Sequence, residues 1–180
     1  MLESSRRKAF LWVALLALLL AIPLLVINQR PESLMPVISA RFPSVQWIDV
    51  ATLAEWMTRP APDSPLVLDA RSPEEFAVSH LKGARRVDPN RPGIESLGIA
   101  LDRTVVVYCS VGYRSGAIAE KLEDSGFDEV YNLEGGIFAW ANEGRPIFRG
   151  DGLANAVHPY DPFWARFLRE DLRASRRAGE

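Results

Sequence analysis

The segment Thr104–Cys109, TVVVYC, constrains the fold more than any other part of the chain. It is short, rich in β-branched residues and almost uninterrupted in apolar character, which favours a strand buried on both faces, as in a parallel sheet. The segment SGAIAEKLEDSGF that follows has helical apolar periodicity, with Gly126 at its expected end. Cys109, the only cysteine of the chain, is therefore predicted at the carboxyl end of a buried strand, before a loop and a helix that begins near Ser115.

Further apolar runs alternate with helical segments on both sides of Cys109. Strands are predicted within VQWIDV, LVLD and EVYNL, and helices within ATLAEWM and IFAWAN. Ser72 and Glu75 form a capping box with Pro73 at the first helical position, so another short helix follows LVLD directly. Strands that alternate with helices indicate an α/β domain with a mainly parallel sheet.

The position of Cys109 favours a reactive thiol. In an open parallel sheet, ligands bind at the carboxyl edge of the strands. Backbone N–H groups of a glycine-containing loop, the N-terminus of the next helix and the charge of Arg114 would all favour a thiolate there. The alternative is that Cys109 is a small buried hydrophobic residue, which is the commonest fate of a free cysteine.

The length of the loop limits the chemistry. Arg114 lies five positions after Cys109, so the loop is one residue shorter than the C-x5-R loop that holds a phosphoryl group in cysteine phosphatases. A tighter loop suits a smaller species, such as a cysteine that carries one extra sulfur atom. At this point the sequence resembles the rhodanese family of sulfurtransferases, whose loop has the pattern C-x-x-G-x-R-S, matched here by Cys109–Ser115.

Two further segments are similar to rhodanese motifs. Upstream, LVLDARSPEEFAVSHLKGA resembles the D-x-R-x-x-x-E-F…G-H-I-x-G-A signature, with Ser79 in place of the usual glycine. Downstream, VYNLEGGIFAWANEGRPI resembles the closing V-x-x-L-x-G-G-x-x-x-W…G-x-P segment. The resemblance covers roughly Ser44 to Phe148. It implies a rhodanese-like three-layer α/β domain with a mainly parallel sheet of about five strands.

The resemblance also implies an activity and a site. Cys109 would take sulfane sulfur from a thiosulfate- or persulfide-type donor, become a persulfide and pass the sulfur to a thiol or cyanide, with no metal or organic cofactor. Asp69 and Arg71 are expected to support the site, and His80 is expected to be a packing residue rather than a general base. The substrate-binding residues implied are those of the loop, namely Ser110, Val111, Gly112, Tyr113, Arg114 and Ser115.

Other functions are less consistent with the residues. A cysteine phosphatase or arsenate reductase on the same fold is opposed by the loop length, and a non-catalytic binding module is opposed by the intact Cys109, Gly112 and Arg114. A Cys-His-Asn hydrolase has little support, because His158 lies outside the matched segments. The net charge of −2 gives no electrostatic signature for nucleic acid. One cysteine excludes an intramolecular disulfide and a cysteine-rich zinc site.

The N-terminal segment predicts a location. Ala9–Ile27 contains nineteen residues without a charge, enough for a helix that crosses the bilayer core. Basic residues 6–8 precede it and Arg30 alone follows closely, so the N-terminus is expected in the cytoplasm and the catalytic domain outside it, in the periplasm of a Gram-negative cell. A cleaved signal peptide is the alternative, but the apolar run is long and no A-x-A-like site follows promptly.

These segments give four predicted regions. They are a membrane anchor over 1–28, a proline-containing linker over 29–43, the rhodanese-like domain over 44–150 and an amphipathic, arginine-rich helical tail over 151–180, which Asp161 would cap. The tail would cover an apolar patch of its own domain, or else bind an anionic membrane or a partner. In an oxidising compartment, a lone reactive thiol is protected by its loop, regenerated by small thiols or paired with a protein thiol.

Overall fold

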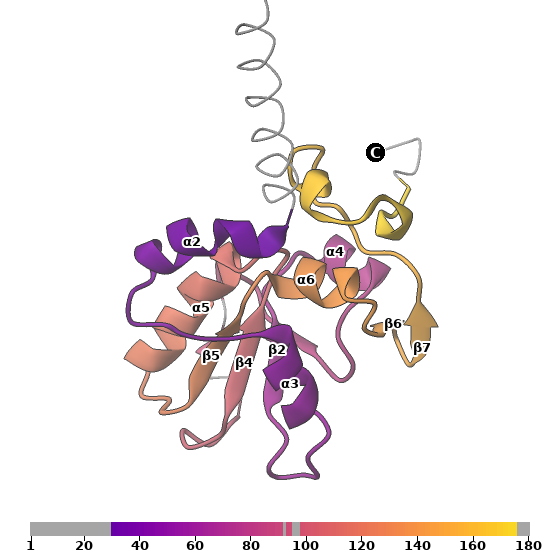
Figure 1. Ribbon diagram of the computed structural model, residues 1–180. Coiled ribbons are helices and arrows are strands. Elements are labelled where there is room, and N and C mark those ends of the chain that lie inside the picture. Colours follow the sequence, from indigo (N-terminus) through magenta and orange to yellow (C-terminus); the bar gives the residue numbers. More distant parts are fainter. Residues whose placement is uncertain (1–29, 92, 95–97, 176–180) are drawn as a thin grey trace, which may run out of the picture.

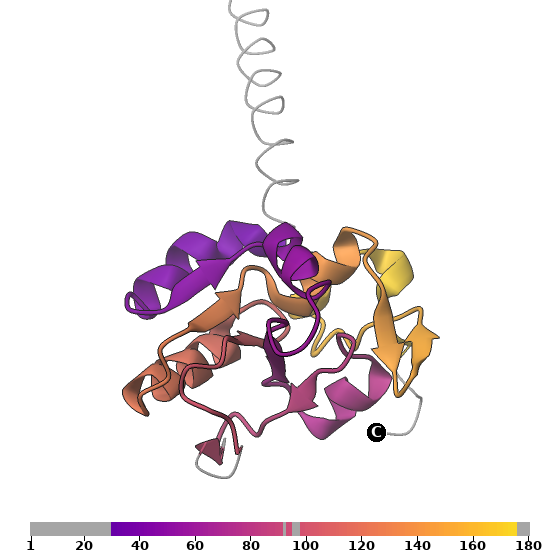
Figure 2. The same cartoon turned by 90° about the horizontal axis from the view of Figure 1, so that it is seen from below.

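The computed structural model describes residues 30–91, 93–94 and 98–175, and it contains a central sheet with helices on both faces (Figures 1 and 2). The described elements, in chain order, are η1 (Pro31–Leu34), α2 (Met35–Arg41), β1 (Gln46–Ile48), α3 (Val50–Trp56), β2 (Leu66–Asp69), α4 (Pro73–Val78), β3 (Arg85–Arg86), β4 (Val105–Tyr108), α5 (Tyr113–Asp124), β5 (Val130–Leu133), α6 (Gly136–Asn142), β6 (Ile147–Arg149), β7 (Gly152–Ala154), η3 (Trp164–Phe167) and η4 (Glu170–Leu172).

The sheet confirms the predicted α/β class. Its five strands lie in the order β1-β5-β4-β2-β3, and every neighbouring pair is parallel. β4 is central and all four of its side chains are buried, as its uninterrupted apolar sequence predicted. The capping box of Ser72 and Glu75 also forms at the start of α4. A two-stranded antiparallel sheet of β6 and β7 is an addition that the sequence did not predict.

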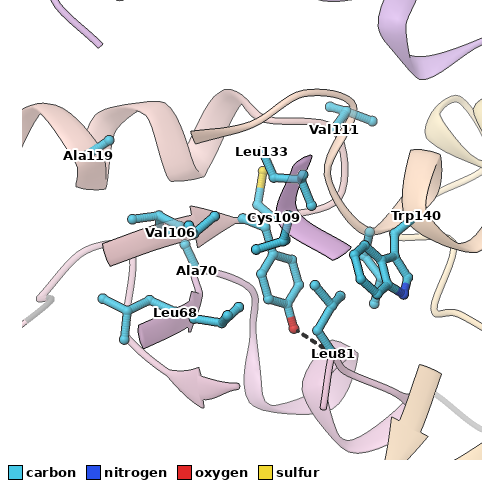
Figure 3. Packing of buried hydrophobic residues seen from close by; sticks show 14 of the residues in the cluster. Leu68, Ala70, Leu81, Val106, Cys109, Val111, Ala119, Leu133 and Trp140 are labelled. Atoms are coloured by element: carbon cyan, nitrogen blue, oxygen red, sulfur yellow. Dashed lines mark hydrogen bonds between the residues drawn. The ribbon is translucent and has the colours of Figure 1, made fainter. Parts of the chain in front are cut away.

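The hydrophobic core extends to the cysteine itself. Cys109 has 1% of its surface exposed and belongs to the same cluster as Val106, Ala70 and Leu133. Figure 3 shows its sulfur at the rim of this cluster, beside Leu133 and below Val111. The thiol is therefore held in a packed environment, although it follows the last residue of β4.

The predicted linker over residues 29–43 is wrong for its described part. Residues 30–41 instead form η1 and α2, which pack on the domain, and Pro31, Ile38 and Phe42 are buried. Two of the prolines that suggested a linker occupy the first turns of these helices, where a missing N–H has little cost. Figure 1 shows α2 lying alongside α5, and η1, which precedes α2, contacts α6.

The predicted continuous helix in the tail is also wrong. Asp161 does cap a helical turn by accepting from the N–H groups of Phe163 and Trp164, but this turn is the short 3-10 helix η3. The side chain of Asn142 then accepts from Arg169 N–H and donates to the Phe167 carbonyl, which occupies backbone groups that a longer helix would use. Phe167 and Leu168 are buried in the domain core, consistent with a tail that covers its own domain.

The predicted anchor, Ala9–Ile27, lies outside the described residues. Among the described residues, the structure has no helix that is long and apolar enough to span a membrane.

Candidate active site

The loop Cys109–Gly112 is held in place by hydrogen bonds from the elements around it. At the start of α6, the N–H groups of Ile137 and Phe138 donate to the carbonyls of Cys109 and Ser110 at 2.9 and 3.1 Å. From β5, the buried Asn132 side chain donates to the Gly112 carbonyl at 2.8 Å. Carbonyl groups of the loop are thus engaged by neighbouring elements, which fixes the backbone that surrounds the sulfur atom.

Gly112 turns the chain from the loop into α5. Its φ of 110° lies in the region that disfavours side chains, and its N–H donates to Cys109 Sγ at 3.2 Å. The first N–H groups of an α-helix have no partner within the helix. In α5 these belong to Tyr113, Arg114 and Ser115, so the helix N-terminus offers its positive end beside the loop.

Arg114 is held by a carboxylate. Its guanidinium contacts both oxygens of Glu75, at 2.6 and 2.8 Å, and donates to Ser110 Oγ at 2.9 Å, while Ser110 Oγ donates to Glu75 Oε1 at 3.0 Å. Burial alone would raise the pKa of Glu75, but the hydrogen bonds and charge of Arg114 outweigh it and lower the pKa to about 2. The same pairing raises the pKa of Arg114, against the opposing effect of burial. The pair fixes the loop to α4.

We expect the replacement Glu75→Gln to lower the free energy of unfolding by about 3 kcal/mol at pH 7, because it leaves Arg114 without its charged partner. The carboxylate has a lower pKa folded than its usual 4.5, so its contribution is complete above pH 4.5 and is lost as pH falls toward 2. The difference between wild type and variant, measured by denaturant unfolding, should therefore shrink as the pH falls below 4.5. Glu55→Gln, in the exposed pair of Glu55 with Arg59, is the matched control and should change little. A pH-independent difference would contradict this account of Glu75.

Asp69 and Arg71 form a second buried pair beneath the strand ends. Arg71 Nη2 lies 2.7 Å from Asp69 Oδ2 and donates to the Ser79 carbonyl at 2.6 Å. The hydroxyl of Tyr108 donates to Asp69 and accepts from Leu81 N–H. Burial and the Asp69 charge raise the pKa of Tyr108 well above its usual value, so its hydroxyl stays protonated. Because Tyr108 precedes Cys109, this network positions the end of β4.

A pocket of about 410 Å³ opens above Cys109. Five of the seven predicted loop residues line it, namely Cys109, Ser110, Val111, Tyr113 and Arg114. Gly112 contributes its N–H to the sulfur, whereas Ser115 is fully buried in the first turn of α5 and does not line the pocket. Asp69 and Arg71 do not line it either.

His80 is a packing residue, as the sequence suggested. Its ring stacks on Phe76 with 4.3 Å between the ring centroids, and Nδ1 lies 2.9 Å from the Leu81 carbonyl oxygen. His158 lies in the tail, where Nδ1 accepts from Tyr160 N–H. Within the described ranges there is no group of three or more His, Cys, Asp or Glu side chains placed to hold a metal ion.

Sequence reasoning missed two side chains that contact the loop, Glu75 and Asn132, and half of the residues that line the pocket. Glu75 has the spacing of a capping box, and this local role is a sufficient explanation for a glutamate at that position. The sequence therefore gives no sign that Glu75 also contacts Arg114. The wall residues that were missed come from the two ends of the described chain, and they are Leu34, Val37, Ile38, Tyr160 and Trp164. The apolar residues of the tail were the only signal that pointed to a packing role.

The fold and the site together define a class of protein, an α/β domain that presents a buried cysteine in a tight loop at the carboxyl edge of a parallel sheet. The profile of the rhodanese-like domain family matches residues 49–143, and the chain belongs to this family. The match ends before the tail and begins after α2, so both outer walls of the pocket lie beyond it.

Named relatives agree with this assignment. The chain is 38% identical over 87 residues to a protein of Allochromatium vinosum named sulfurtransferase. This match covers 48% of the present chain and 81% of the Allochromatium protein. It is 36% identical over 85 residues to the thiosulfate sulfurtransferase GlpE of Pseudomonas aeruginosa, covering 47% and 74% of the two chains. Among solved structures, a rhodanese-related protein of Thermoplasma volcanium is similar with a TM-score of 0.51 and 27% identity, covering 57% of this chain and 97% of that one. A function of the sulfurtransferase type is therefore supported at the level of the family.

Proposed function

We propose that the protein moves sulfane sulfur through a persulfide on Cys109. The observation that carries the proposal is the placement of one cysteine, in the loop C-x4-R, with its sulfur 3.2 Å from the Gly112 nitrogen and at the base of an accessible pocket. The sulfur of Cys109 accepts a hydrogen bond from this N–H, and the loop leads directly into the positive N-terminus of α5. Both features would stabilise negative charge on a persulfide.

The reaction takes two displacements. The Cys109 thiolate attacks the outer sulfur of the donor, the sulfur–sulfur or sulfur–sulfonyl bond breaks, and the leaving group departs with the electron pair. A thiol or cyanide then attacks the terminal sulfur of the persulfide, and Cys109 leaves as the thiolate. No external oxidant or reductant is consumed, because the sulfane sulfur is exchanged between nucleophiles.

The role of Arg114 differs from that of a free cation beside the sulfur. Its charge is compensated by Glu75, and its main contribution is to fix the loop between α4 and α5. The hydroxyl of Ser110 completes this link. Positive potential at the sulfur then comes chiefly from oriented backbone N–H groups, which need no reorganisation during the reaction.

Initial-rate kinetics tests the two-step transfer. With the donor and cyanide concentrations varied together, the double-reciprocal plots should be parallel, since the donor product leaves before cyanide reacts. Intersecting plots would indicate that both substrates bind before any chemistry. Such a result would contradict a free persulfide intermediate.

We also propose that residues 9–27 anchor the protein in a membrane, with the domain on the extracytoplasmic side. The support is the uncharged apolar run and the basic residues that precede it. Compartment matters for the chemistry, because outside the cytoplasm a lone thiol needs protection from oxidation. The burial of Cys109 and the cover from α2 would supply such protection.

Full-length protein is expected to stay in the membrane fraction after alkaline carbonate washing, whereas a shortened chain beginning at Arg30 should be found in the supernatant. Arg30 is the appropriate start because Pro31, Ile38 and Phe42 are buried against the domain. A reporter fused after Glu180 should be active only in a form that works outside the cytoplasm. Release of the full-length chain by carbonate, or a cytoplasmic reporter signal, would overturn this proposal.

A further inference from the structure

The walls of the pocket above Cys109 are mostly apolar and come from both ends of the described chain. Leu34 and Val37 of η1 and α2 lie on the N-terminal side, and Tyr160 and Trp164 lie on the C-terminal side. Its volume of about 410 Å³ is within the range of sites for organic small molecules. This space is larger than the transfer of a single sulfur atom requires.

The pocket offers no net positive charge to an anion. Among its lining residues, all of them in the described part of the chain, Arg114 is the one cation. Both oxygens of Glu75 contact its guanidinium, and the ring of Tyr160 lies over it at 4.8 Å. A thiosulfate dianion would lose its hydration against these walls without gaining a free cation, and burial of unpaired charge is strongly unfavourable.

We propose that this pocket selects sulfur donors with an apolar organic body and at most one negative charge, and that the segments outside the family match determine this preference. The inference rests on the proposed persulfide function and specifies its donor. The organic body would lie against Val37, Tyr160 and Trp164 while the outer sulfur reaches Cys109. Transfer to a buried apolar site is favourable in proportion to the apolar area removed from water.

A series of donors with one reactive group tests the preference. Thiosulfate, methanethiosulfonate and benzenethiosulfonate all carry a sulfane sulfur on a sulfonyl centre. The Cys109 thiolate would take that sulfur, the bond between the two sulfur atoms would break, and sulfite, methanesulfinate or benzenesulfinate would leave with the electron pair. We expect kcat/KM of the full-length protein in lipid nanodiscs, with cyanide as acceptor, to rise along this series by about tenfold or more overall. Rates of each donor with a free thiol correct for intrinsic reactivity.

A pair of matched variants assigns the preference to the pocket. Val37 and Leu153 are similarly exposed, at 75% and 76%, but only Val37 lines the pocket, and Leu153 is on β7. Val37→Lys should raise the ratio of thiosulfate to benzenethiosulfonate kcat/KM by a factor on the order of three, through a new partly screened charge at the mouth. Leu153→Lys adds the same charge elsewhere and should leave the ratio unchanged. Trp164→Ala should lower the preference for benzenethiosulfonate over methanethiosulfonate.

The possible outcomes distinguish a failure of the donor preference from a failure of the proposed persulfide function. Absence of transfer from every donor would overturn the proposed function. Transfer with thiosulfate as good as or better than benzenethiosulfonate, after correction, would overturn the donor preference and leave the persulfide function standing. Equal shifts in Val37→Lys and Leu153→Lys would show that the preference does not arise in this pocket.

Discussion

Replacing Cys109 by serine is expected to lower sulfur transfer by at least about 1,000-fold, because a serine hydroxyl cannot form a persulfide and removal of a nucleophile removes the whole covalent route. The change is small in volume, and a serine oxygen can accept from the Gly112 N–H that now donates to the sulfur. Since the site is buried, a loss of about 1 kcal/mol in stability is expected for the more polar side chain. Transfer rates and thermal unfolding of the same preparation measure both effects.

The comparison with Ser110→Ala provides the control. Ser110 contacts Glu75 and Arg114 rather than the sulfur, so its loss should slow transfer without abolishing it. Turnover of Cys109→Ser comparable to that of Ser110→Ala would contradict covalent catalysis. A large loss of unfolding free energy in Cys109→Ser would instead mean that the cysteine is chiefly a core residue.

Gly136→Ala is expected to have the largest effect on stability, with a loss of about 4 kcal/mol in unfolding free energy. A Cβ atom at Gly136 would lie 2.7 Å from the Ser110 carbonyl oxygen and closer still to that of Cys109, and both are backbone atoms that cannot turn aside. Its φ of 55° adds the strain of the left-handed region. The loop would have to move away from α6, so transfer should fall even below the unfolding temperature.

Gly144 is a control that separates the steric clash expected at Gly136 from the strain of a positive φ. It also has a positive φ, of 75°, but a Cβ there would meet no atom within 4 Å. Gly144→Ala should therefore cost only the conformational strain of about 1 kcal/mol, with sulfur transfer close to that of the wild type. Equal destabilisation of the two variants in denaturant unfolding would contradict the close approach of α6 to the loop.

Much of the domain follows from local sequence signals. The apolar run of β4, the capping box of α4 and the glycine at the end of α5 each act within a few residues, so periodicity and capping rules locate them. The two-residue strand β3 has too few side chains for a pattern. It forms because Leu68 and Asp69 of β2 pair with it, which depends on the assembled sheet.

The site was only half predictable. Cys109 and its loop are contiguous in sequence, whereas the contact of Arg114 with Glu75 joins residues 39 positions apart. The capping role of Glu75 uses its Oε2 atom at 3.0 Å from Ser72 N, and the same carboxylate also binds Arg114. The capping motif was enough to explain Glu75 from the sequence, so its second role, the contact with Arg114, was not predicted.

The walls of the pocket were missed for a different reason. Prolines in the segment before β1 suggested a linker, but Pro31 and Pro36 lie in the first turns of η1 and α2. In the tail, apolar residues with helical spacing suggested one long helix. The side chain of Asn142 instead forms hydrogen bonds with the Phe167 carbonyl and the Arg169 N–H, which a longer helix would need for itself. Both segments are defined by packing on the domain, which single-sequence patterns do not encode.

The most direct test of the account is the intact mass of the protein after incubation with benzenethiosulfonate and removal of excess donor, without an acceptor. The wild type should gain the mass of one sulfur atom, the fragment that contains Cys109 should carry it, and cyanide should remove it with formation of thiocyanate. Cys109→Ser treated in the same way should gain nothing. Turnover by a wild-type protein that never carries the added sulfur, or a gain that persists in Cys109→Ser, would contradict the claim that sulfur passes through Cys109.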